Sequence, residues 1–260
     1  MLTIIGRWVL TRLSLIFEII LTIVGAFSDY LASFRQGRTA TRLVFYKQVY
    51  FTGLEGSGII VAIAVILGTV IIAQVVSLVG INGTLTAKIL VWVVFRELAP
   101  LLTAVIIIAR SGTAIAAELG TMKINGEIEA IEILGIPTQR YLIMPRVLGV
   151  TTSFVVLTLY FVLTAFIGSF LIASIGWNLP YDQFIQGILS SLSVKEVAML
   201  FIKSLLFGLF VSATCCCYGL SVGRSATEIP QAATRAVMTS LFTVFFLDGM
   251  ITYLSSLSFY

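Results

Sequence analysis

Two adjacent residues of opposite charge, Arg96 and Glu97, lie inside an otherwise apolar stretch of the sequence. A charged side chain near the centre of a bilayer costs about 2.5–3.5 kcal/mol on insertion scales, so such residues usually face protein or a wet cavity. Pro100 follows one helical turn later, and because proline has no N–H, the carbonyl of Arg96 loses its usual helical donor. The sequence therefore predicts a polar, bent place within a membrane helix.

Lys203 and Asp248 are two further ionisable residues within apolar stretches. With a rise of about 1.5 Å per residue, all four groups fall in the outer half of the bilayer. One interpretation is that they line a cavity that opens outward, where two cations and two anions beside apolar walls suit an amphiphile with an anionic headgroup. The alternative is that they form internal ion pairs, Arg96 with Glu97 or Asp248, that only hold the helices together. Adjacent residues point about 100° apart on a helix, so Arg96 and Glu97 are expected to face different neighbours.

The composition identifies the class of protein that must position these groups. Of 260 residues, 59% are hydrophobic and only 11% are charged, which predicts an all-α integral membrane protein. Five spans leave little chain for a soluble domain, so residues 1–260 are expected to form a single membrane domain. The expected spans are residues 53–79, 87–111, 147–172, 197–218 and 237–257.

Most Lys and Arg residues lie before the first expected span, between the second and third, and between the fourth and fifth, which are all on one side of the membrane. Because positive residues favour the cytoplasmic side, this distribution predicts a cytoplasmic N-terminus and an external C-terminus. Residues 1–50 are expected to form an amphipathic interfacial helix and a cytoplasmic linker. Within residues 118–135, Ile124, Ile128, Ile131 and Leu134 recur at helical spacing between charged residues. This pattern predicts a short cytoplasmic helix, which either lies on the membrane surface or docks a soluble partner.

Several kinds of chemistry lack the residues they need. The sequence has no histidine, and its cysteines are only Cys215, Cys216 and Cys217, which are expected to pack as small apolar side chains. No metal site or cofactor is expected in this chain. The basic residues are spread over segment ends rather than gathered in a stripe, so nucleic acid is not an expected partner. No Walker motif occurs, and energy for transport must come from a partner subunit or an ion gradient.

Two other functions fit parts of this pattern. An ion-coupled carrier for an amphiphilic substrate would use Glu97 and Asp248 as protonatable groups, although no internal repeat relates the two halves of the chain. An intramembrane hydrolase or acyltransferase would use Ser111 or Glu97, but no paired catalytic motif supports it.

Two long segments of the sequence resemble the MlaE (YrbE-type) family of ABC transporter permeases. FRELAPLLTAVIIIARSGTAIAAELGTMKINGEIEAIEILGIPTQRYLIMPRVLG is similar to the central signature of the family. SATEIPQAATRAV followed by FFLDGMIT is similar to its C-terminal signature. The resemblance extends from about residue 46 to the end of the chain.

The resemblance implies a multi-pass permease of the bacterial inner membrane that moves phospholipids to or from a periplasmic MCE-domain protein. It implies a homodimer that binds a cytoplasmic ABC ATPase, which would hold ATP and Mg, together with a small cytoplasmic accessory subunit. It also implies substrate-binding roles for Arg96, Glu97 and Lys203, and the depth argument adds Asp248. Residues 118–135 would be the coupling helix, with ATPase-coupling roles for Glu118, Lys123, Glu127, Glu129 and Glu132.

Overall fold

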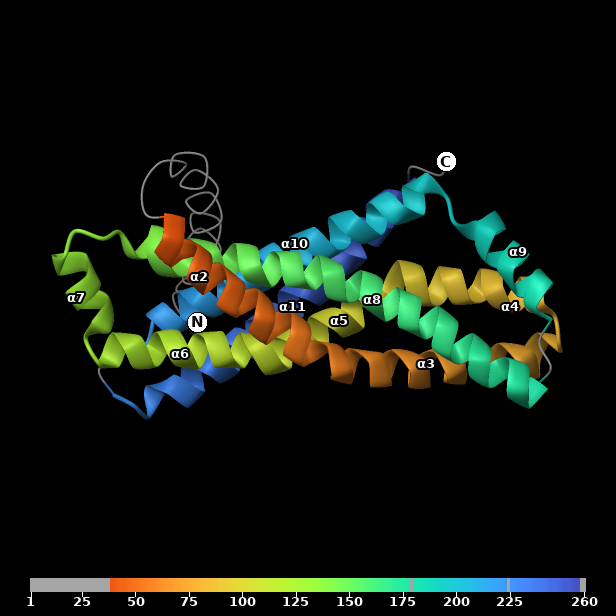
Figure 1. Cartoon of the computed structure of the whole chain (residues 1–260), viewed down its shortest axis with the longest axis horizontal. Helices are drawn as coiled ribbons and strands as arrows, with labels where there is room; N and C mark the ends of the chain where they lie inside the picture. Colours follow the sequence, from red (N-terminus) through yellow and green to blue (C-terminus); the bar gives the residue numbers. More distant parts are fainter. Residues whose placement is uncertain (1–37, 178–179, 224, 258–260) are drawn as a thin grey trace, which may run out of the picture. The chain divides into compact units, whose positions relative to one another are not determined.

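The computed structural model describes residues 38–177, 180–223 and 225–257, and all regular structure within these ranges is helical (Figure 1). Five helical stretches among these residues are long and apolar enough to cross a membrane, which confirms the predicted all-α membrane fold. These stretches are Thr41–Val79, Gly83–Ile124, Gln139–Trp177, Val194–Leu220 and Glu228–Leu257.

Most of these stretches consist of α-helices, and three of them contain short π-helical segments, labelled η. The α-helices are α2 (Arg38–Val49), α3 (Glu55–Val79), α4 (Gly83–Leu90), α5 (Ala99–Ile107), α6 (Thr113–Ile124), α7 (Glu127–Ile133), α8 (Met144–Trp177), α9 (Tyr181–Ser191), α10 (Val194–Leu220) and α11 (Glu228–Leu257). The π-helical segments are η1 (Tyr50–Leu54), η2 (Val91–Leu98), η3 (Ile108–Gly112) and η4 (Gln139–Ile143).

The helices extend beyond the spans that hydropathy predicts. α2 occupies part of the expected linker, and α4 already begins at Gly83, where Asn82 accepts a hydrogen bond from the N–H of Leu85 and so caps the helix. α9 is an additional helix of 11 residues between the third and fourth expected spans. The expected interfacial helix lies in residues that precede the described part of the chain.

The predicted coupling helix over residues 118–135 is divided in the structure. α6 ends at Ile124, and Gly126 has the left-handed φ of 74° that commonly follows a helix end. α7 then begins at Glu127 (Figure 1). Glu118 and Lys123 therefore lie on α6, whereas Glu127, Glu129 and Glu132 lie on α7.

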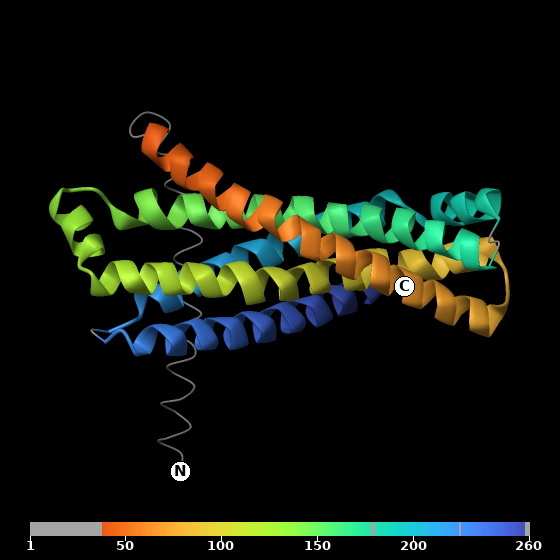
Figure 2. The ribbon, with the colours of Figure 1, turned by 60° about the horizontal axis from the view of Figure 1, so that its bottom comes forward.

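The chain forms two compact units, and the long helices supply residues to both. Among the described residues, the first unit contains 38–50, 108–151, 208–223 and 225–243. In this unit α6 packs closely on the end of α10, because a Cβ on Gly219 would lie 2.9 Å from the carbonyl oxygen of Ala116. The hydroxyl groups of Tyr218 and Thr239 lie 2.9 Å apart and connect α10 to α11. Figures 1 and 2 both show α6 beside the first turns of α11.

The second unit contains, of the described residues, 51–107, 152–177, 180–207 and 244–257. Small residues bring its helices together, as is common where lipid gives no hydrophobic drive for helix association. A Cβ on Gly68 of α3 would lie 2.9 Å from the carbonyl oxygen of Ala165 on α8. A Cβ on Gly187 of α9 would lie 2.6 Å from Ala87 on α4. These close approaches bring α3 against α8 and α9 against α4 within the second unit.

Candidate functional site: a buried ionic cluster

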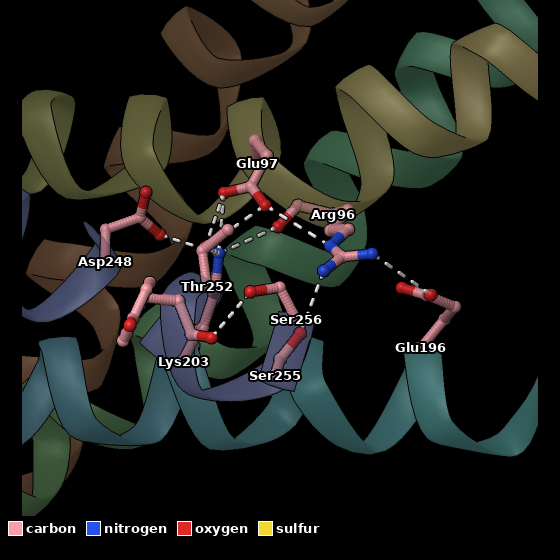
Figure 3. Close-up of polar contacts among 9 residues, drawn as sticks. Arg96, Glu97, Glu196, Lys203, Asp248, Thr252, Ser255 and Ser256 are labelled. Carbon is pink, nitrogen blue, oxygen red and sulfur yellow. Dashed lines mark hydrogen bonds and ion pairs between the residues drawn. The ribbon is translucent and has the colours of Figure 1, made fainter. Parts of the chain in front are cut away.

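Lys203 is the centre of a group of polar side chains in the second unit (Figure 3). Its side chain is only 1% exposed. The Nζ atom contacts four oxygens: Glu97 Oε2 at 2.7 Å, Asp248 Oδ1 at 2.8 Å, Thr252 Oγ1 at 2.9 Å and the carbonyl oxygen of Arg96 at 3.2 Å. The contacts with Glu97, Thr252 and the Arg96 carbonyl are hydrogen bonds and use the three N–H donors of the ammonium group, whereas the contact with Asp248 is an ion pair.

The hydrogen bond from Lys203 to the Arg96 carbonyl replaces one that Pro100 cannot form. An α-helix would supply the N–H of residue 100 to this carbonyl, and proline has none. The neighbouring backbone is π-helical over η2, where the N–H of Ala99 donates to the carbonyl of Val94. The proline itself lies in the first turn of α5, a position that tolerates it. The predicted backbone irregularity at this place is a π-helical segment, and the Lys203 ammonium donates to the carbonyl that the proline leaves without its usual partner.

Arg96 connects three helices. Its Nη2 donates to Ser255 Oγ on α11 at 2.8 Å, and its Nη1 lies 3.7 Å from Glu196 Oε1 on α10. Its Nε lies 3.4 Å from Oε1 of the adjacent Glu97. The hydroxyl of Thr252 in turn donates to the Glu97 carboxylate at 3.2 Å. Apart from their mutual contact, the Arg96 side chain faces Ser255 and Glu196, whereas Glu97 faces Lys203 and Thr252, as their angular separation on the helix predicts.

The structure brings together all four residues predicted as the substrate site, but it does not give them equal access. Lys203 is enclosed, whereas 30% of the Glu97 side chain is exposed. Arg96, Glu196 and Asp248 are intermediate, with side chains 15%, 13% and 11% exposed. Glu97 is therefore the most accessible of these side chains and Arg96 the next, whereas Lys203 is enclosed.

Sequence reasoning missed Glu196, Thr252 and Ser255, although their spacing contains a signal. Thr252 and Ser255 follow Asp248 at helical intervals, so the three residues form a polar stripe on one face of the last span. Glu196 precedes Lys203 by two helical turns and lies on the same face of α10. Both spacings are visible in the sequence once Asp248 and Lys203 are taken as starting points.

The residues predicted to couple to an ATPase lie in the first unit and fall into two groups. Glu118 on α6 pairs with the buried Arg146, with 2.9 Å between Glu118 Oε1 and Nη2, and Lys123 donates to the carbonyl of Leu220. These two residues therefore have internal structural contacts. Glu127, Glu129 and Glu132 lie on α7 and are exposed.

α7 ends in an apolar tip formed by Ile133 and Leu134, of which sequence reasoning named only Leu134. Ile133 and Leu134 are 86% and 76% exposed, while Ile128 is buried. Glu132 Oε1 accepts a hydrogen bond from Thr138, and Glu127 Oε1 accepts one from Asn125. Each end of the short helix is thus hydrogen-bonded to the segment that adjoins it. The result is an ordered helix with exposed carboxylates and two exposed apolar side chains.

Comparison with known proteins gives a consistent family assignment. Residues 45–254 match the family described as Permease MlaE. A probable ABC transporter permease protein of Synechocystis is 30% identical over 221 residues, which cover 84% of each chain. A probable ABC transporter permease protein of Rickettsia conorii is 26% identical over 238 residues, 88% of this chain and 90% of the relative.

A plant chloroplast protein is also similar. Protein TRIGALACTOSYLDIACYLGLYCEROL 1 of Arabidopsis thaliana is 26% identical over 209 residues, which cover 79% of this chain and 59% of the relative. Its name refers to a galactolipid.

The central position of Lys203 predicts a large stability effect. Lys203→Met leaves the Glu97 and Asp248 carboxylates without their buried cation, and breaking a buried ion pair in this way costs about 3–5 kcal/mol. We expect the thermal unfolding midpoint of the detergent-purified protein to fall clearly. Adding Glu97→Gln and Asp248→Asn to the same chain should recover part of the loss, because no carboxylate then faces the missing cation.

The matched control is Lys88→Met, which removes an exposed lysine from α4 of the same unit. It should leave the midpoint almost unchanged. An equal, small effect of both lysine substitutions would contradict the central structural role of Lys203.

Proposed function

The chain belongs to the MlaE family of permeases, and from this premise we propose that it moves phospholipids between the bacterial inner membrane and a periplasmic MCE-domain partner. It is the membrane subunit of an ABC transporter rather than the catalytic subunit, and ATP is hydrolysed by a separate ATPase. The observation that carries the lipid proposal is the cluster around Lys203, because charged groups in an apolar span match the headgroup of an amphiphile beside its acyl chains.

In the proposed mechanism, Glu97 and Arg96 meet the headgroup while Lys203 and Asp248 hold these two residues in place. The exposure of the side chains supports this division, since Glu97 is the most accessible charged residue of the cluster and Lys203 the least. The acyl chains would lie along neighbouring apolar side chains such as Trp92, which is exposed on the same segment η2. Release of the lipid then requires the headgroup to leave Arg96 and Glu97, not Lys203.

We propose that the ATPase docks on α7 from the cytoplasm. The exposed pair Ile133 and Leu134 supports this, because two large apolar side chains at the end of a short helix are suited to insertion into a groove of a partner protein. The exposed carboxylates of Glu127, Glu129 and Glu132 would surround that contact and favour a basic rim on the partner. Glu118 and Lys123, which have internal partners, would instead hold α6 to its neighbours.

The remaining parts of the proposal concern assembly and orientation. A homodimer is supported by α11, where Phe245, Met250 and Tyr253 are exposed around Gly249. The N-terminus would be cytoplasmic and the C-terminus periplasmic, as the distribution of Lys and Arg predicts. A small cytoplasmic accessory subunit would accompany the ATPase.

The docking proposal predicts that α7 controls ATPase binding. The double substitution Ile133→Ser and Leu134→Ser should reduce co-purification of the ATPase by about tenfold or more, because each buried apolar side chain contributes roughly 1.5–3 kcal/mol at an interface. The triple substitution Glu127→Gln, Glu129→Gln and Glu132→Gln should weaken it less and make it less sensitive to salt.

The control for these variants is Asp182→Asn, which removes an exposed carboxylate from α9 in the other unit. Co-purification and ATPase activity should equal those of the unsubstituted protein. If the α7 variants behave like this control while remaining folded, the docking role of α7 is wrong.

Transport itself is tested by reconstituting the co-purified complex in liposomes with a fluorescent phospholipid. We expect transfer of the lipid to an acceptor to require ATP and to continue when a proton ionophore collapses the gradient. Glu97→Gln combined with Arg96→Gln should abolish transfer while the ATPase stays bound. Transfer that persists without the ATPase and stops with the ionophore would instead establish an ion-coupled carrier.

A further inference from the structure

The charge of the cluster is not balanced. Among the residues that the structure describes, it contains two cations, Arg96 and Lys203, and three carboxylates, Glu97, Glu196 and Asp248. With all groups ionised, one negative charge is in excess. Without Glu196, the charged residues of the apolar spans are equal in number for the two signs, which led to the expectation of an anionic headgroup. The additional carboxylate changes the kind of headgroup that the site favours.

The most accessible charged side chain of the cluster is also negative. Lys203 is enclosed, and its Nζ already contacts four oxygens, so it has no N–H left for a lipid phosphate. The most exposed ionic side chain is Glu97, at 30%. Its carboxylate already contacts Lys203 Nζ, the Thr252 hydroxyl and Arg96 Nε, and with about four lone-pair sites it can accept one further hydrogen bond. A group that carries both a positive charge and N–H donors complements this position.

Arg96 is the cation that a phosphate can reach. Its contact with Glu196, at 3.7 Å between Nη1 and Oε1, is the longest ion pair among the described residues of the cluster. It is therefore the pair that an incoming phosphate most easily replaces, and a guanidinium group matches phosphate geometry well. Glu196 would remain beside the bound phosphate and repel it if the headgroup had no compensating positive charge.

From these contacts we propose that the cluster selects zwitterionic phospholipids whose headgroup carries a cationic amine beside the phosphate, with the amine at Glu97 and the phosphate at Arg96. The excess carboxylate, Glu196, determines this preference over anionic phospholipids. This inference rests on the proposed function, since it names the class of lipid that the same site takes up.

The test uses the full chain with its co-purifying subunits in nanodiscs of equimolar phosphatidylethanolamine and phosphatidylglycerol with identical acyl chains. A photocrosslinking residue replaces Ser256, which is exposed and lies one helical turn beyond Thr252 (Figure 3). Captured lipids are identified by mass spectrometry. We expect phosphatidylethanolamine to exceed phosphatidylglycerol about fivefold, the ratio that one partly exposed charge interaction provides.

Two substitutions test the role of the excess charge. Glu196→Gln should lower the capture ratio towards one, because it removes the carboxylate that repels an anionic headgroup. Asp182→Asn removes an exposed carboxylate from α9, outside the cluster, and should leave the ratio at about fivefold. A ratio that is the same in all three proteins would show that Glu196 does not set the preference and would overturn that assignment.

A second crosslinking position, in place of Ile66, reports the surrounding bilayer, since this residue of α3 is 61% exposed. Capture at position 256 that exceeds capture at position 66 but favours neither lipid, or favours phosphatidylglycerol, would overturn the headgroup inference and leave the proposed lipid site intact. Capture that is equal in amount and composition at the two positions would overturn both.

Discussion

The contact of one buried ammonium group with four oxygens is the interaction on which this structure depends. Lys203 lies on an apolar helix where an isolated cation would be costly, and the carboxylates of Glu97 and Asp248 compensate that cost at 2.7 and 2.8 Å. Because these partners come from η2 and α11, the ammonium fixes how α10 lies against both. Replacing this group by an apolar one would leave two carboxylates facing each other in the same place.

The same ammonium permits the backbone irregularity beside it. Pro100 removes a donor from the Arg96 carbonyl, and Lys203 supplies one at 3.2 Å. The π-helical geometry of η2 places two consecutive residues of opposite charge so that one faces Glu196 and Ser255 and the other faces Lys203 and Thr252. Segments of this kind are frequent at functional sites. Within the cluster the Glu97 side chain is the most exposed and the Lys203 side chain the least, so the accessible charged groups are held in place by an enclosed one.

The membrane spans and four of the cluster residues could be predicted from the sequence, because the free energy of placing a residue in a bilayer depends mainly on that residue and its neighbours in the chain. The cost of charge in an apolar span singled out Arg96, Glu97, Lys203 and Asp248, and hydropathy identified five spans. Glu196 was missed because it lies at the start of α10, where a carboxylate is unremarkable beside a helix N-terminus. The internal partners of Glu118 and Lys123 were also out of reach, since they depend on Arg146 and Leu220, which are distant in the sequence. Such long-range contacts follow from packing, which hydropathy and spacing do not determine.

In this permease an internal cation organises an ionic cluster in which a carboxylate and a guanidinium stay accessible, and these two groups are the proposed contacts of the lipid headgroup. The most direct measurement is an electron cryo-microscopy map of the complete transporter in nanodiscs. If the headgroup binds as proposed, the map will show headgroup density in contact with Glu97 and Arg96, with Lys203 still covered by Glu97, Asp248 and Thr252. Headgroup density in direct contact with the Lys203 ammonium, or lipid bound only at sites away from this cluster, would contradict it.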